Sequence, residues 1–160
     1  MKAATINDIK QELNAIAPAK LLDLCIRLAK YKKENKELLS YLLFEAHDES
    51  AYIESVKRDM DIEFAGINRS NVYFVKKSLR KILRTTGKHI RHAGSRQAEV
   101  ELLLYFCSVL INSGIPVHKN LVLTNLYQFQ LKKIGKVIAT LHEDLQYDYL
   151  KELNKLMQSN

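Results

Sequence analysis

Residues 71–93 have the sequence NVYFVKKSLRKILRTTGKHIRHA, and this stretch determines how the chain is organised. On a helical wheel that advances about 100° per residue, one arc is mostly apolar and the opposite arc is basic. The stretch therefore predicts one amphipathic helix, with Ser70 or Asn71 at its start and Gly94 as a left-handed C-cap. The arc that we expect to pack on the core consists of Val72, Val75, Leu79, Ile82, Leu83, Thr86 and Ile90.

The opposite arc of this predicted helix carries seven cations and one tyrosine. Several like-charged pairs, such as Arg80 and Arg84, are four residues apart, and each costs roughly a few tenths of a kcal/mol. A helix surface selected only for stability more often alternates its charges, as Glu54 and Arg58 do. The arc is therefore our candidate anion-binding and nucleic-acid-binding site, and its residues are Lys76, Lys77, Arg80, Lys81, Arg84, Lys88, Arg91 and Tyr73.

The charge of the whole chain comes from the same region. Residues 64–98 contain nine of the 25 Lys and Arg residues and none of the 18 Asp and Glu residues. The remaining 125 residues hold 16 basic and 18 acidic groups, so the net charge of +7 arises from one block. A fold does not require this segregation, whereas binding of an anionic partner does.

Composition favours helices throughout the chain. The 160 residues are 47% hydrophobic and 27% charged, with only five Gly and two Pro, whereas turn-rich β folds need more of both. We expect a single all-helical domain over residues 1–160. The two cysteines, Cys25 and Cys107, lie in apolar surroundings, which is typical of a reduced cytoplasmic protein.

No membrane-spanning or leader segment is expected. Residues 1–10 have no apolar signal core. The longest nearly apolar run, residues 102–111, is too short for a bilayer, which takes roughly 20 residues. We therefore expect a cytoplasmic protein with no transmembrane segment.

Working outward from residues 71–93, the sequence predicts seven or eight helices. A helix that begins near Thr5 and Asp8 precedes one that begins at Pro18 and has so wide an apolar arc that we expect it to be largely buried. A third helix extends to about residue 46, and Asp48 caps a fourth. After residue 94 come an apolar, central helix over about 95–111, a break at 112–116, helical spacing over 121–145 and a last helix around Leu153.

Consecutive helices with short turns form either a short α-solenoid or an irregular helical bundle. The helical hairpin over residues 19–46 is similar in general style to HEAT or armadillo pairs. We favour the solenoid slightly, because two helices at intermediate positions along the chain are apolar on nearly every side. The helical pairs share no repeat signature, so the similarity concerns architecture only.

No motif predicts catalysis, a cofactor or a metal. His89 and His92 are three residues apart without nearby carboxylates, so we expect them to add to anion binding near pH 6 rather than to hold a metal. The five glycines are scattered singly, so there is no glycine-rich phosphate loop. We therefore expect a protein that is not an enzyme.

The sequence leaves two functions open. The first is a binding module that uses residues 71–93 to engage the phosphate backbone of nucleic acid, with Tyr73 available to stack on a base. The second is a helical scaffold that binds an acidic protein, or a homodimer in which the basic helix is neutralised. The basic arc would have no binding role at all if acids of neighbouring helices paired with its cations, because it would then be an ordinary structural surface.

Overall fold

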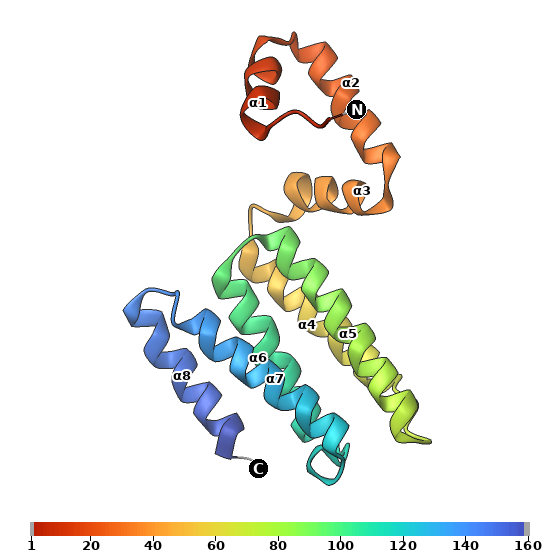
Figure 1. Cartoon of the computed structure of the whole chain (residues 1–160), viewed down its shortest axis with the longest axis vertical. Helices are drawn as coiled ribbons and strands as arrows, with labels where there is room; N and C mark the ends of the chain where they lie inside the picture. Colours follow the sequence, from red (N-terminus) through yellow and green to blue (C-terminus); the bar gives the residue numbers. More distant parts are fainter. Residues whose placement is uncertain (1, 159–160) are drawn as a thin grey trace. The chain divides into compact units, whose positions relative to one another are not determined.

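Helices form all of the regular secondary structure in the computed structural model, which describes residues 2–158 (Figure 1). The predicted all-α class is confirmed. The elements are α1 (Ile6–Ala15), α2 (Pro18–Tyr31), α3 (Lys33–Ser40), the short π-helix η1 (Tyr41–Glu45), α4 (Glu49–Ala65), α5 (Val72–Ala93), α6 (Arg96–Asn112), the 3-10 helix η2 (Val117–Lys119), α7 (Leu121–Ile138) and α8 (Glu143–Gln158). None of the helices in the described range is both long and apolar enough to cross a membrane.

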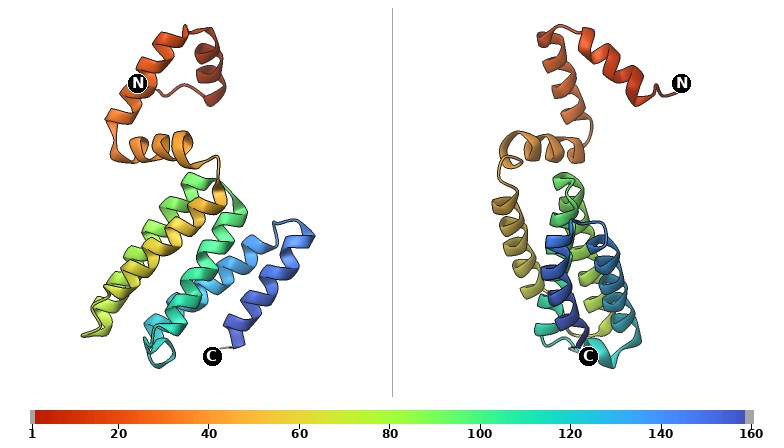
Figure 2. Two further views of the ribbon diagram at one scale, coloured as in Figure 1. Left: turned by 180° about the vertical axis from the view of Figure 1, so that it is seen from behind. Right: turned by 90° about the vertical axis from the view of Figure 1, so that its left-hand side faces the viewer.

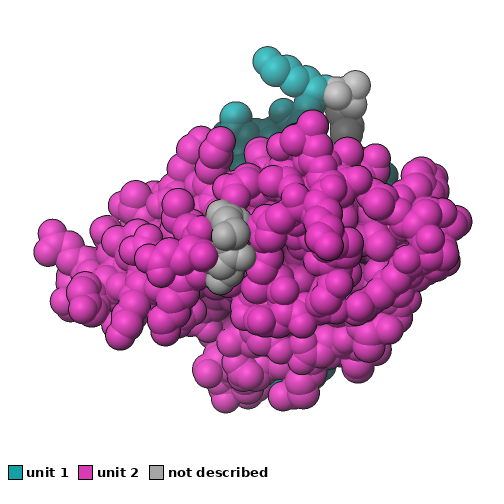
Figure 3. Space-filling view, turned by 90° about the horizontal axis from the view of Figure 1, so that it is seen from below, with its two compact units in different colours: residues 1–44 teal, residues 45–160 magenta. Residues whose placement is uncertain are grey.

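The chain divides into two compact units, residues 1–44 and residues 45–160, which Figure 3 colours separately. The first contains α1, α2 and α3, and the second contains α4 to α8. Among the described residues, the extensive buried core lies in the second unit.

Helix α6 is the centre of residues 45–160, as its nearly continuous apolar sequence predicts. It lies among α4, α5, α7 and α8 and contacts all four (Figure 2). Nine of its residues are buried. Phe106 on α6 packs against Phe64 on α4, with ring centroids 5.4 Å apart. A helix that is apolar on all sides is stable only when other helices surround it, and this arrangement provides that environment.

Helix α5 has the limits that its sequence predicts. The Asn71 side chain accepts a hydrogen bond from the Phe74 backbone N–H at 3.0 Å, which satisfies one of the free donors of the first turn. Gly94 ends the helix at φ 64°, a left-handed conformation that glycine adopts without a Cβ penalty. Between these caps, Val75, Leu79, Ile82 and Thr86 are buried, and Leu83 and Ile90 pack against the core, as the wheel predicts. Val72 was predicted in the same arc but is 39% exposed in the first turn, so the arc faces the core only from Val75 onward.

Helix α2 differs from expectation, because none of its residues is buried. The prediction of a largely buried helix is wrong, because the other helices of residues 1–44 are too short to cover α2. Its neighbours α1 and α3 have only ten and eight residues and also bury none, so they do not cover its wide apolar arc.

Candidate anion-binding surface on α5

The predicted basic arc of α5 lies at the surface of the protein. Lys77, Arg80, Lys81, Arg84 and Arg91 are exposed, and Lys76 and Lys88 at the edges of the arc are half-exposed. Tyr73, at the start of the helix, is 62% exposed. The single helix thus brings together all eight residues that the sequence predicts. The seven cations form a stripe about 22 Å long between Lys76 and Arg91, and Tyr73 lies about one turn before it.

Within the described part of the chain, most of these cations have no carboxylate within 4.0 Å. This holds for Lys76, Lys77, Arg80, Lys81, Arg84 and Arg91. The two other basic residues of the 64–98 block are engaged: the Arg69 Nη1 donates to the Ser113 carbonyl at 2.8 Å, and Arg96 pairs with Glu99 at 3.0 Å.

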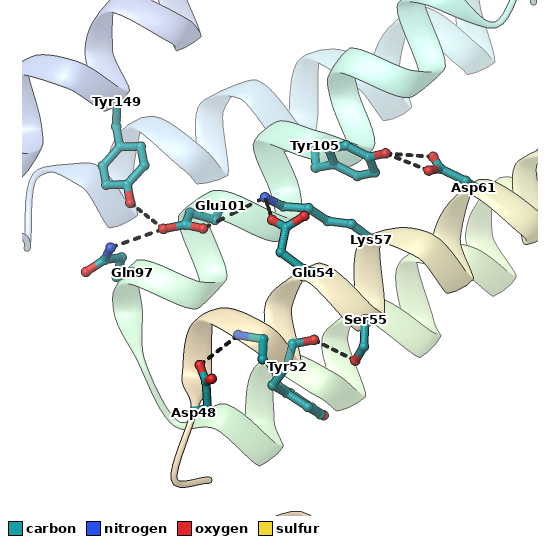
Figure 4. Close-up of polar contacts among 11 residues, drawn as sticks. Asp48, Tyr52, Glu54, Ser55, Lys57, Asp61, Gln97, Glu101, Tyr105 and Tyr149 are labelled. Atoms are coloured by element: carbon teal, nitrogen blue, oxygen red, sulfur yellow. Dashed lines mark hydrogen bonds and ion pairs between the residues drawn. The ribbon is translucent and has the colours of Figure 1, made fainter. Parts of the chain in front are cut away.

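Several acids of the neighbouring helices are already engaged with other partners, and none of these partners lies on α5 (Figure 4). Buried Glu99 pairs with Arg96 and with Lys133, 3.1 Å away. Glu101 accepts a hydrogen bond from the Tyr149 hydroxyl at 2.7 Å, and Asp61 accepts one from the Tyr105 hydroxyl at 2.8 Å. These pairings leave the basic arc without a covering layer of these carboxylates.

The sequence did not single out this polar network between α4, α6 and α8. Lys57 is at its centre, 2.7 Å from Glu54 and 4.0 Å from Glu101. Beside it is a hollow of about 440 Å³ that is also lined by Asp148 and Glu152. The residues of this network come from three helices that are far apart in sequence. The sequence therefore shows that the tyrosines and acids are present, but it does not show that they meet.

The aromatic and histidine residues of α5 divide between two roles. The Tyr73 and Phe74 rings meet edge to face with centroids 5.5 Å apart. The His89 side chain, in contrast, contacts α4, since its Nδ1 atom is 2.8 Å from the Tyr52 hydroxyl. The His92 ring packs edge to face against the His89 ring. The expectation that His89 adds to the anion-binding face is therefore wrong, because this side chain is directed toward α4.

The tyrosines of the polar network predict a loss of stability in alkaline solution. Partial burial, followed by the hydrogen bond to Asp61, raises the pKa of Tyr105 to about 12. Burial and the bond to Glu101 raise the pKa of Tyr149 as well. The folded state keeps these protons when the unfolded chain loses them near pH 10, so the stabilisation is complete below about pH 10 and is lost as pH rises toward 12.

Thermal unfolding measured across this pH range checks the prediction. We expect the midpoint of the wild-type chain to fall above about pH 10, and to fall less in the Tyr105→Phe/Tyr149→Phe double variant. Identical pH dependence of the two proteins would contradict the assignment of this loss to these hydroxyls.

No family model matches this chain, and no curated protein or solved structure does either. Within residues 2–158, no group of three or more His, Cys, Asp and Glu side chains is placed to hold a metal ion. The case for a binding surface on α5 therefore rests on the residues of the helix itself, which place a row of exposed and half-exposed cations at the surface, with the exposed Tyr73 ring at one end.

Proposed function

We propose that this protein is a binding module that uses the basic face of α5 to engage the phosphate backbone of nucleic acid. The observation that carries the proposal is a row of cations at the surface of α5, six of which have no carboxylate within 4.0 Å among the described residues: Lys76, Lys77, Arg80, Lys81, Arg84 and Arg91. Lys76, Lys77, Arg80, Lys81, Arg84, Lys88 and Arg91 neutralise phosphates, and Tyr73 stacks on a base near the start of the helix.

The shape of the row favours a linear polyanion over a compact anion. A pocket for a single phosphate needs donors that converge on one point, whereas these side chains follow one helix for about 22 Å. Arg80 and Arg84 lie in the middle of the row and Arg91 lies at its end, and the planar guanidinium group can bind phosphate oxygens in a bidentate manner. Contacts of this kind position a nucleic acid without reading its sequence.

The salt dependence of binding tests this proposal. If about five phosphates of a duplex are engaged, the logarithm of the association constant falls against the logarithm of salt concentration with a slope of roughly −4.5. Fluorescence anisotropy of labelled duplex and single-stranded oligonucleotides, titrated at salt concentrations from about 50 to 300 mM, measures this slope. Different base sequences of one length should bind with similar affinity.

Two results would contradict the proposal. One is the absence of binding to both kinds of oligonucleotide at low salt. The other is binding whose affinity does not change with salt, because neutralisation of phosphates necessarily releases counterions. An acidic polypeptide that binds where oligonucleotides do not would instead favour the scaffold alternative.

A further inference from the structure

Residues 1–44 expose an unusual amount of apolar side chain. From Ile6 to Ser40, which includes α1, α2 and α3, no residue is buried. Twelve large apolar side chains among residues 2–44 are exposed, and several of them, including Leu22 and Leu28, keep more than half of their surface accessible. A soluble chain rarely leaves such a surface uncovered, and a unit this short rarely builds a core alone.

Part of this surface is a groove between α2 and α3. Its volume is about 290 Å³, and all but one of its lining residues are apolar. Cys25, Leu28 and Ala29 line it from α2. Leu38 and Leu39 line it from α3, and Leu42 follows them in η1.

The distribution of charge on α2 allows two copies of this face to meet. On a helical wheel centred on Cys25, the charged residues Lys20, Asp23, Arg27 and Lys30 all fall in an arc of about 80° on the opposite side. The apolar arc is thus free of charge, and Cys25 is close to the middle of both the arc and the helix. Two antiparallel copies of α2 can pair through this arc without opposing like charges.

The exposed area is sufficient for a stable dimer. At roughly 100 Å² each, the twelve apolar side chains on α1, α2, α3 and η1 together expose about 1,200 Å² per chain. A standard interface buries about 800 Å² per partner, so about two thirds of this area would have to lie in the contact. A two-fold interface uses the same patch on both chains, so a second copy always supplies an apolar face of matching size.

We propose that a second copy of this chain covers residues 1–44, forming a two-fold symmetric dimer through the exposed arc of α2 and the adjoining groove. Leu22 and Leu28, on either side of Cys25, lie at the centre of the interface. The proposal concerns a surface other than α5, and it stands whether or not the protein binds nucleic acid.

Sedimentation or light scattering of the purified full chain over a range of concentrations tests the dimer. The wild-type protein is expected to reach twice the chain mass of 18.5 kDa. Leu28→Glu and Leu22→Glu each introduce a carboxylate on both chains, so a two-fold interface would contain two carboxylates without a cationic partner. Each variant should weaken dimerisation by roughly 100-fold or more. Ile62→Glu is the matched control, because Ile62 on α4 is 71% exposed and lies outside residues 1–44.

Circular dichroism of each variant verifies that the helices remain, since glutamate is a good helix former. Should Leu28→Glu lose helix content, Leu28→Gln gives the same comparison without adding charge. A dimer that both α2 variants weaken and Ile62→Glu does not supports the proposal. A protein that is monomeric at every concentration, a larger assembly, or a dimer that only Ile62→Glu disrupts would overturn it.

Discussion

Replacing Arg80 and Arg84 together by glutamate is expected to lower oligonucleotide affinity by roughly 100-fold at low salt. Both side chains are exposed in the middle of the basic row, and neither has a carboxylate within 4.0 Å in the described part of the chain. The double variant removes two phosphate contacts and adds two repulsive charges. The salt slope should therefore become shallower by about 2, since each contact contributes about 0.9.

The same double variant should leave the stability of the fold unchanged or slightly higher. Glutamate at position 80 is four residues from Lys76, and glutamate at position 84 is four residues from Lys88. Each substitution thus replaces like-charge neighbours with attractive pairs, which are worth about 0.2–0.5 kcal/mol each. A loss of binding together with a maintained or raised melting temperature distinguishes a binding surface from one that only stabilises the helix.

Lys132→Glu/Lys136→Glu is the matched control for this experiment. These two exposed lysines on α7 are also four residues apart, and their reversal changes the net charge by the same amount. We expect the control to alter affinity by less than about threefold, because these lysines lie outside the basic row and salt screens their long-range effect on a ligand bound there. Equal losses in the two double variants would show that only the overall charge matters, and would contradict a specific role of α5.

Phe106→Ala is expected to destabilise the fold by about 3–5 kcal/mol. Phe106 has no exposed surface, lies on the central helix α6 and packs against Phe64. Its truncation leaves a cavity among helices that are already in close contact, so the loss combines lost burial with lost packing. Since single domains have stabilities of about 5–15 kcal/mol, this is a large share of the total.

Urea denaturation followed by circular dichroism measures this effect. Phe129→Ala on α7 is the control, because Phe129 is 65% exposed and its truncation should cost less than about 1 kcal/mol. A similar loss of stability at the two positions would contradict the assignment of α6 as the centre of the core.

The parts of the fold that were predicted correctly depend on local chemistry. Asn71 and Gly94 limit α5 because a capping side chain and a left-handed residue are needed at those points whatever the helix packs against. Helix α6 is central because its sequence offers almost no polar side for water. The choice between solenoid and bundle, and the single domain over residues 1–160, remain predictions.

The parts that the sequence did not reveal depend on which helices meet. The apolar arc of α2 looks like that of a buried helix, but burial also requires neighbours, and α1 and α3 are too short to supply them. His89 is close enough along the helix to the cations to suggest a shared role, yet its position on the wheel brings it to Tyr52 of α4. The partners of Glu101, in turn, are up to 48 residues away in sequence.

Chemical footprinting of lysines is the most direct test of the central claim that α5 binds nucleic acid. Acetylation of the chain with and without a duplex oligonucleotide, followed by mass spectrometry, compares Lys76, Lys77 and Lys81 on α5 with Lys132 and Lys136 on α7. We predict that bound oligonucleotide protects the α5 lysines and leaves the α7 lysines reactive. Protection of the α7 lysines with unchanged reactivity on α5 would contradict the claim.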